Sequence, residues 1–441
     1  MPAPLLSYYG DDLTGSTDVM EALSLGGVPT VLFLSIPNAG LLERFADCRA
    51  IGLAGTSRSE TPEWMDENLK PAFAWLRSLD ASVCHYKVCS TFDSAPNVGN
   101  IGRAIEIGRK VFKQATVPII VGAPQLKRYT AFGNLFAAYR GVTYRIDRHP
   151  VMSRHPVTPM PEADLLVHLG RQTELRLGLI DLVQLTASDA AERVDAQAAT
   201  KDILLLDVAD AETQRLAGRE LWRCTVRHGA FVAGSSGVEY ALLPTWVAED
   251  LAAGETQFEP LAPVEQLAVV SGSVSPTTEA QIRHAVANGF DAIAVDPIGL
   301  SGDNARAVIV NAVRDGLQVL AAGRSVILYT ALGPSADRGG EIDSSPGARH
   351  RLGRGLGDIL QRLVIDGGLS RAVIAGGDTS SHALGRLGVD ALTVRMPLPQ
   401  TPGSPLCIAH SGLAKTDQLE VAMKGGQIGA DEYFCTIRDG G

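Results

Sequence analysis

Short apolar runs alternate with stretches of helical spacing along the whole chain. The runs have the length and composition of buried strands, and most are separated by segments in which apolar residues recur with a helical period. This alternation is typical of an α/β fold built on parallel sheets. The strands are expected at residues 5–9, 28–34, 50–54, 118–122, 203–208, 231–234, 267–271, 292–295, 325–330 and 372–375.

The alternation is interrupted once, by an acidic and proline-containing stretch at residues 248–266 that follows no clean period. A chain of 441 residues is long enough for two domains. We therefore predict two α/β domains with a cleft between them, at residues 1–250 and 267–441, joined by a linker at residues 251–266. No repeat of fixed period is present.

Composition narrows the range of partners. Hydrophobic residues make up 45% of the chain, which allows a large core. The 39 basic and 49 acidic residues give a net charge of -10, so no general positive field attracts nucleic acid or anionic lipid. An anionic ligand needs a local cluster of donors. The six cysteines form no CxxC pair, and the N-terminal segment has no basic region before an apolar run. These features predict a cytoplasmic protein, and a homo-oligomer remains open.

The first candidate site follows the first predicted strand, where Asp11 and Asp12 stand between Gly10 and Gly15. Ligands of α/β proteins bind at such strand-to-helix junctions. The glycine spacing resembles a phosphate loop, but the lysine is missing and paired acids repel phosphate. The acids are better suited to sugar hydroxyls, to deprotonating one of them, or to a metal. The alternative is a helix cap. If Asp11 bonds the N–H groups of the turn, Asp12 is the acid that faces the ligand.

Two further loops in the first half could hold a carboxylate or a carbonyl oxygen. Arg58 follows the third strand and offers a planar pair of donors. Lys87 is followed by the hydroxyls of Ser90 and Thr91. Each loop could also be ordinary surface. Cys89 has no histidine signature around it and is not expected to be a nucleophile.

A basic cluster at residues 145–155 contains Arg148 and His149 and could grip an anionic substrate. Its histidines lack the spacing and the third ligand of a zinc site. The alternative is a loop paired with acidic neighbours.

The second half contains neutral, glycine-rich turns of the kind that cradle phosphates. Adjacent glycines at a helix start let backbone N–H groups approach a phosphate, and small hydroxyls add donors. We expect the best such turn to precede a helix at residues 382–387, with Asp378 able to reach Mg²⁺. A capped helix start without ligand is the alternative. The expected nucleotide-binding residues are Ser273, Gly376, Gly377, Asp378, Thr379, Ser380, Gly426 and Gly429.

At these residues the chain resembles the four-carbon acid sugar kinases, formerly known as a domain of unknown function. The motifs that carry the resemblance occur in order along nearly the whole chain, from Asp11-Asp12-Leu13-Thr14-Gly15 to Lys424-Gly425-Gly426. The resemblance implies an N-terminal domain that binds a sugar acid through Asp11, Asp12, Arg58, Lys87, Ser90 and Thr91. Arg148 and His149 of the basic cluster are added to the expected substrate-binding residues on their charge alone. The resemblance also implies a C-terminal domain that binds ATP, with Mg²⁺, and transfer of the γ-phosphoryl group to a hydroxyl of the acid. Asp12 and Asp378 are then the expected catalytic residues.

One motif departs from the family pattern. Cys89 stands where members usually have an aspartate, and Phe92-Asp93-Ser94 replaces Leu-Arg-Gly. The substrate is therefore expected to differ from a plain tetronate, and a similar subgroup is associated with acids of the 3-oxo-isoapionate type. Two other classes are weighed, a non-catalytic sugar-acid binding protein and a dehydrogenase or aldolase for the same acids. A dehydrogenase would need a dinucleotide fingerprint and an aldolase an activated lysine, and neither is evident in the sequence.

Overall fold

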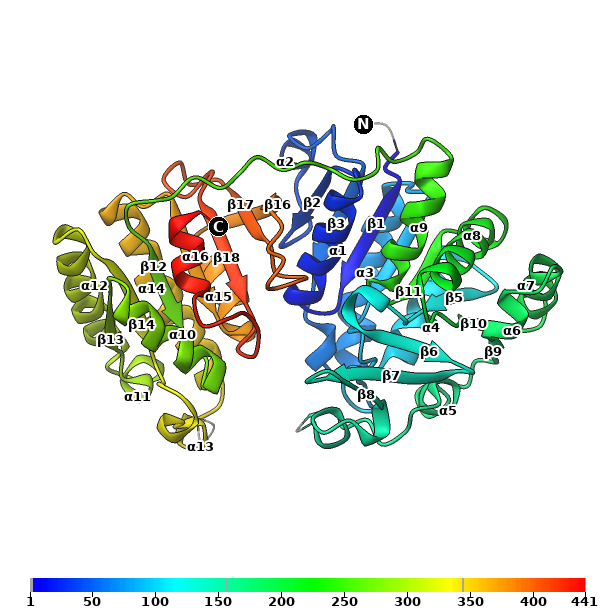
Figure 1. The fold of residues 1–441 in the computed structure, drawn as a ribbon, viewed down its shortest axis with the longest axis horizontal. Coiled ribbons are helices and arrows are strands. Elements are labelled where there is room, and N and C mark those ends of the chain that lie inside the picture. The colour runs from blue at the N-terminus through cyan, green and yellow to red at the C-terminus, as the bar shows by residue number, and fades with distance from the viewer. Residues whose placement is uncertain (1–2, 156, 343–344, 441) are drawn as a thin grey trace. The chain divides into compact units, whose positions relative to one another are not determined.

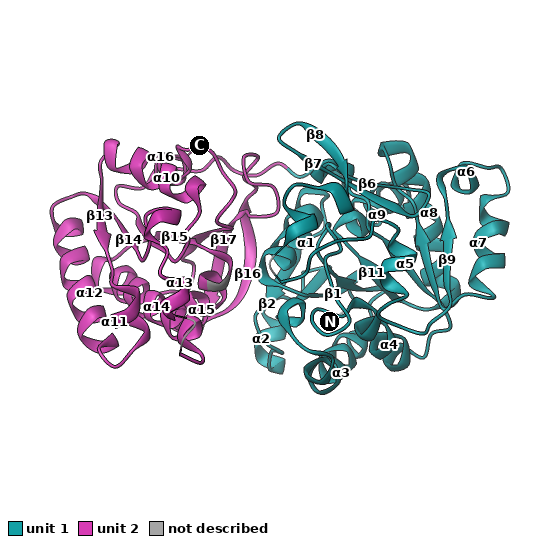
Figure 2. Ribbon diagram, turned by 90° about the horizontal axis from the view of Figure 1, so that it is seen from below, with its two compact units in different colours: residues 1–256 teal, residues 257–441 magenta. Residues whose placement is uncertain are grey.

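The structure is a computed structural model that describes residues 3–155, 157–342 and 345–440, without the side chain of Asp378. The chain divides into two compact units, Met1–Thr256 and Gln257–Gly441 (Figure 2). Both combine strands with helices, so the predicted pair of α/β domains is confirmed. Residues 249–267, between the last helix of unit 1 and the first strand of unit 2, contain neither helix nor strand.

The main sheet of unit 1 is parallel at every strand pair (Figure 1). From one edge to the other its strands are β2 (Thr30–Phe33), β3 (Ala50–Ala54), β1 (Leu6–Gly10), β4 (Val83–Lys87), β11 (Phe231–Gly234), β5 (Val117–Ile120), β10 (Ile203–Leu206) and β9 (Leu177–Ile180). A small antiparallel sheet contains β6 (Arg128–Ala131), β7 (Asn134–Tyr139) and β8 (Val142–Arg145). It lies beyond the carboxyl ends of β5 and β10, since the N–H of Thr130 bonds the carbonyl of Val208 at 2.7 Å.

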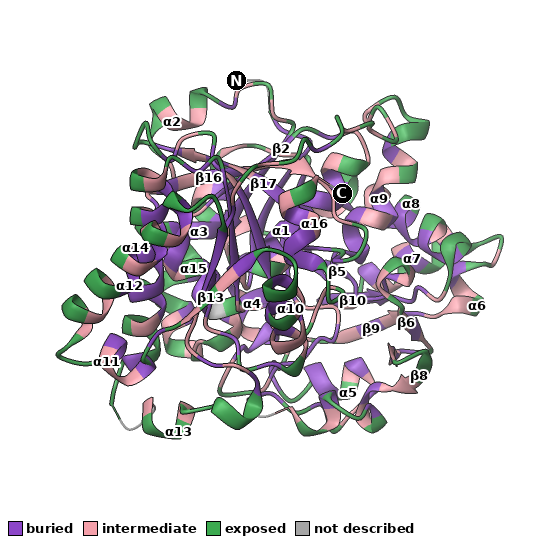
Figure 3. Cartoon of the chain, turned by 60° about the vertical axis from the view of Figure 1, so that its left-hand side comes forward, coloured by how far each residue is buried: buried purple, intermediate pink, exposed green. Residues whose placement is uncertain are grey.

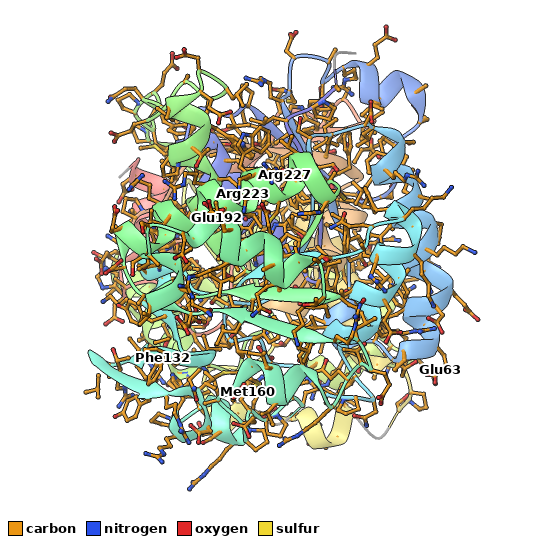
Figure 4. All side chains as sticks on the ribbon, turned by 90° about the vertical axis from the view of Figure 1, so that its right-hand side faces the viewer. Glu63, Phe132, Met160, Glu192, Arg223 and Arg227 are labelled. Atoms are coloured by element: carbon orange, nitrogen blue, oxygen red, sulfur yellow. The ribbon has the colours of Figure 1, made fainter. Side chains whose placement is uncertain are left out.

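The helices of unit 1 begin where the sequence offers caps. Asp12, Thr61 and Asn100 each accept a backbone N–H of the first turn that follows them. The helices are α1 (Leu13–Leu25), α2 (Ala39–Glu43), α3 (Pro62–Ser78), α4 (Ile101–Phe112), α5 (Leu165–Leu169), α6 (Leu182–Leu185), α7 (Ala190–Ala198), α8 (Ala211–His228) and α9 (Gly237–Ala248). At the outer edge, Arg223 and Arg227 of α8 lie beside Glu192 of α7, and both arginines pair with Asp195 (Figure 4).

Unit 2 has a sheet whose first five strands are parallel, followed by an antiparallel hairpin. In spatial order these are β13 (Phe290–Ala294), β14 (Ser325–Tyr329), β12 (Ala268–Ser271), β15 (Arg371–Ala375), β18 (Glu420–Lys424), β17 (Leu406–Ser411) and β16 (Val389–Met396). Its helices are α10 (Pro276–Ala287), α11 (Pro297–Ser301), α12 (Ala305–Ala321), α13 (Gly339–Ile342), α14 (Ala348–Gly367), α15 (Gly377–Arg386) and α16 (Tyr433–Asp439).

The strands form the buried centre of each unit, and exposed residues concentrate on the outer helices and loops (Figure 3). Runs such as Ile203–Leu206 and Ala268–Ser271 are buried at every position, as expected for parallel strands covered on both faces. The six cysteines are free. Among the helices of the described residues, none is both long and apolar enough to span a bilayer.

Both units share one strand order. We number the first four strands of each unit in chain order. Across the sheet, the second strand is followed by the third, then the first and then the fourth. This order is β2-β3-β1-β4 in unit 1 and β13-β14-β12-β15 in unit 2. The connections that leave the first and fourth strands therefore diverge, and ligands of open α/β sheets bind beside such strand ends. In each unit, the sequence motifs stand at this place.

Candidate functional sites

In unit 1, three motifs that are far apart in sequence meet at the carboxyl ends of β1, β3 and β4. The N–H of Asp11 bonds the carbonyl of Lys87 at 2.9 Å, and the N–H of Arg58 bonds the carbonyl of Asp11 at 3.1 Å. These bonds continue the pairing of the parallel strands beyond their ends. The candidate residues on the three loops are thereby held in one site.

The two neighbouring acids of this site differ in environment. Asp12 is the N-cap of α1, because its side chain accepts the N–H of Gly15, and the side chain is 29% exposed. Asp11 is only 4% exposed, and its Oδ1 has no hydrogen-bond partner in the described structure. Burial, with a further contribution from Asp12, raises the pKa of Asp11 to about 7. The cap considered for Asp11 from the sequence is therefore made by Asp12, and Asp12 is also the accessible acid.

Arg58 links Asp12 to a third carboxylate. Its guanidinium lies 2.6 Å from Oδ2 of Asp12 and 3.1 Å from both carboxylate oxygens of Asp93. Asp93 also accepts the hydroxyls of Thr91 and of Thr158, the latter at 2.8 Å. Burial raises the pKa of Asp93, but Arg58 and the hydroxyl donors outweigh it, so the net pKa is lowered.

Asp93 and Thr158 were not among the residues expected at the site. Asp93 was visible in the sequence as a departure from the family motif, and that departure was a usable signal. No sequence signal pointed to Thr158, because it reaches Asp93 only through the irregular segment that follows the small sheet.

Lys87 lies deeper in the same site, at 2% exposure, with its ammonium 3.7 Å from Asp18. Burial lowers the pKa of Lys87, but the charges of Asp18 and Asp11 outweigh it and raise the net value. The lysine is therefore charged. Ser90 is half-buried. Burial raises the pKa of the Cys89 thiol, which agrees with an unreactive cysteine.

The basic cluster does not act as one group. Arg145 pairs with Asp147 at 2.6 Å, and Arg148 is exposed. His149 is buried, and its Nδ1 accepts the N–H groups of Val151 and Met152, both at 3.1 Å. Burial lowers the pKa of His149, so the ring is neutral. In the described structure neither Arg148 nor His149 bonds Asp12, Arg58 or Asp93, and their substrate role stays a prediction.

His155 does reach this network. Its Nδ1 accepts the N–H of Thr158 at 3.1 Å, and Thr158 in turn donates to Asp93. A part of the basic segment is thus tied to the site through a chain of hydrogen bonds.

In unit 2 the turns that follow β12 and β15 lie against each other. The N–H of Gly272 bonds the carbonyl of Ala375 at 3.1 Å, and a Cβ at Gly272 would lie 2.3 Å from the hydroxyl of Thr379. Gly376 has a φ of +122°, which only glycine adopts readily. The expected helix at residues 382–387 begins earlier, at Gly377, because the backbone already turns there. Thr379 therefore lies in its first turn, where free N–H groups are available. The N–H of Ser380 already bonds the carbonyl of Gly376 at 3.0 Å.

Ser273 and Gly426 complete this turn on its other side. Thr278 on α10 lies 3.0 Å from the hydroxyl of Ser273 and donates to the carbonyl of Gly426 at 3.0 Å. A Cβ at Gly426 would lie 2.6 Å from the Ser273 hydroxyl. Gly429 has a φ of +89°, and a Cβ there would crowd Gln281 and neighbouring side chains. Both the backbone conformation and the packing therefore favour glycine at this position.

Next to these turns opens a pocket lined by residues that include Gly272, Thr330, Arg338 and Thr379. Asp378 stands in α15, but its side chain lies outside the described structure. Among the described residues, no group of three histidine, cysteine or acidic side chains is arranged to hold a metal ion. The turns offer neutral N–H and hydroxyl donors, and this chemistry suits phosphates.

The two units together define a protein that binds a sugar in one half and a nucleotide in the other. Residues 6–242 match the model of a sugar-binding N-terminal domain, and residues 268–434 match the model of a nucleotide-binding C-terminal domain. The chain belongs to the four-carbon acid sugar kinase family, whose members are sugar-acid kinases.

Relatives support this membership over the full length. A 3-oxo-isoapionate kinase of Paraburkholderia graminis is 48% identical and covers 99% of this chain and 94% of its own length. A 3-oxo-tetronate kinase of Methylobacterium radiotolerans is 29% identical over 98% of both chains. Among solved structures, a Salmonella typhimurium protein named a tRNA synthase superposes with a TM-score of 0.77 at 22% identity, covering 98% of this chain and 97% of that one. That likeness concerns the fold alone.

Proposed function

We propose that the chain is an ATP-dependent kinase that phosphorylates a hydroxyl group of a branched oxo sugar acid of the 3-oxo-isoapionate type. The observation that carries this proposal is the 48% identity to a 3-oxo-isoapionate kinase across nearly all of both chains. The relatives named 3-oxo-tetronate kinases are more distant, at 24% to 29% identity. Those enzymes act on a smaller oxo acid, so the branched acid is the first choice.

In this proposal the sugar acid binds at the carboxyl ends of β1, β3 and β4. Arg58, Lys87, Ser90 and Thr91 bind its carboxylate and oxo oxygens, and Asp11 completes the site beneath them. Arg58 already donates to Asp12 and Asp93, so only its remaining N–H groups can bind the acid. Lys87, with its three N–H donors, then contributes most of the positive charge. Arg148 and His149 are proposed to approach the acid from the small sheet.

Asp12 is proposed as the catalytic base, because it is the more exposed of the paired acids. It accepts the proton of the substrate hydroxyl while the hydroxyl oxygen bonds to the γ-phosphorus and ADP leaves with the β–γ bridging oxygen. Arg58 fixes the orientation of the Asp12 carboxylate through a bond of 2.6 Å. Positioning and charge neutralisation supply most of the rate in such transfers.

ATP is proposed to bind in unit 2, with its phosphates on Ser273, on the segment from Gly376 to Ser380 and on Gly426 and Gly429. The residues fit, since Gly377 has open space where a Cβ would stand and the helix start behind it carries free N–H groups. Bound Mg²⁺ would neutralise developing charge on the phosphates. Asp378 is proposed to face it. Mg²⁺ is commonly held by one or two carboxylates, water and the phosphates themselves.

The test is ADP release from ATP and Mg²⁺ with a panel of acids: 3-oxo-isoapionate, 3-oxo-tetronate and the unoxidised tetronates. We expect the highest kcat/KM with 3-oxo-isoapionate and little turnover with plain tetronates. Equal or better turnover of 3-oxo-tetronate would contradict the substrate assignment. Binding of the acids without any ADP release would instead favour a sugar-acid binding protein.

A further inference from the structure

Lys424 is the last residue of β18. Its backbone lies beside the glycine turn, since Ala375 is its register partner and its carbonyl accepts the N–H of Gly376 at 2.9 Å. Its side chain is 1% exposed. The sheet therefore fixes the ammonium group inside the cradle made by the turns after β12 and β15.

The ammonium group of Lys424 lacks a counter-ion among the side chains that the structure describes. Its one bond there is to the hydroxyl of Thr278, at 3.0 Å, and that hydroxyl also contacts Ser273 and Gly426. An ammonium group has three donors and is costly to bury without an anion. Within the described part of the chain, the surroundings of Lys424 supply a single neutral acceptor.

Lys87 provides a direct comparison, because it is also fully buried. Its ammonium lies 3.7 Å from Asp18, and the charges around it raise its pKa. Burial alone acts on Lys424 and lowers its pKa to about 8. One buried lysine thus has an acidic partner, and the other has none among the side chains that the structure describes.

We propose that Lys424 binds a phosphate group of the nucleotide, opposite the N–H groups of residues 377–379 at the start of α15. This inference rests on the proposed function and extends it by one residue. A phosphate has the charge that the lysine lacks and enough oxygens for its free donors. The hydroxyls of Ser273 and Thr278 are neutral donors on the same side, so nothing in this described part of the cradle repels an anion.

The proposal predicts how nucleotide affinity depends on pH. A phosphate favours the charged lysine, so binding should hold Lys424 protonated in the complex. Above about pH 8 the free protein loses this proton, and binding must then take one up. The Kd for ADP should rise by up to about tenfold per pH unit in that range.

The experiment compares the full-length wild type with K424M and K424R, and with K415M as a control at an exposed lysine of the same unit. ADP, inorganic triphosphate and adenosine are titrated by calorimetry. We expect K424M to bind ADP and triphosphate about ten- to a hundredfold more weakly. K424R should recover part of this loss, while adenosine binding and the K415M variant stay unchanged. The pH dependence above about pH 8 should disappear in K424M.

Thermal unfolding separates this role from a structural one. K424M removes a buried charge without a partner, so its Tm should be equal to or above that of the wild type. Unchanged ADP affinity in K424M, or a pH dependence that persists, would overturn the assignment of Lys424 even if the kinase reaction is observed. Failure of every acid to release ADP, with the Lys424 effects intact, would reject the proposed function and leave the phosphate site standing.

Discussion

Replacing Asp11 by asparagine should stabilise the protein at neutral and basic pH. Asp11 is buried, and the pKa of its carboxyl is raised from its usual 3.8 to about 7. Between these two values the folded chain holds a proton that the unfolded chain has released, so stability falls as pH rises through this range. Asparagine has the same shape and carries no charge, and it avoids this loss.

The magnitude follows from the size of the shift. For each pH unit between the two pKa values, the free energy of unfolding of the wild type falls by about 1.4 kcal/mol relative to that of the variant. From about pH 5 to about pH 8, the free energy of unfolding of Asp11→Asn should therefore gain about 2 to 3 kcal/mol over that of the wild type. This difference should level off above about pH 7.

The assay is urea unfolding of the wild type and Asp11→Asn at both pH values, followed by tryptophan fluorescence and circular dichroism. Asp47→Asn, at an exposed acid of the same unit, is the matched control. A difference that does not change with pH would refute the reasoning, and so would a variant that loses stability relative to the wild type as pH rises.

Three further changes test the proposed sites. Asp12→Asn keeps an N-cap residue but removes the charge, so kcat should fall by about 10² or more with little change in Tm; unchanged turnover would make Asp12 structural. Lys87→Met should raise the KM for the sugar acid about ten- to a hundredfold and leave the KM for ATP unchanged, and an unchanged acid KM would remove Lys87 from the site. Gly377→Val adds a side chain in open space at the start of α15. It should raise the KM for ATP without lowering the Tm, and a lower Tm with normal KM would assign the glycine to the fold.

The sequence predicted the strand framework well because parallel strands are buried on both faces and read as continuous apolar runs. The strands Ala50–Ala54 and Phe231–Gly234 match their predicted ranges. It missed β4 and β9 of the parallel sheet of unit 1, the small sheet of β6, β7 and β8, and β16, β17 and β18 of unit 2. β16 and β17 form an antiparallel hairpin, which has a weaker and more interrupted pattern than a buried parallel strand.

At the sites, the sequence located the loops but not the pairing of their charges. The turn chemistry around Asp12 and Gly376 is local and can be read from neighbouring residues. The bond from Arg58 to Asp93 joins residues on two separate loops, and Thr158 joins from a third segment. Such contacts depend on how irregular backbone packs, which no local period encodes.

The strand order that the two units share has a consequence for how such enzymes diversify. Each unit presents its ligand-binding loops from the ends of its own strands, and each set of loops is encoded on its own stretch of the chain. Under the proposed function, substitutions at Cys89 and Asp93 would change the acid-binding loops of unit 1 and leave the turn at Gly376 in unit 2 untouched. A change of acceptor acid would then need substitutions in the first half of the chain only, and the phosphate donor could stay the same.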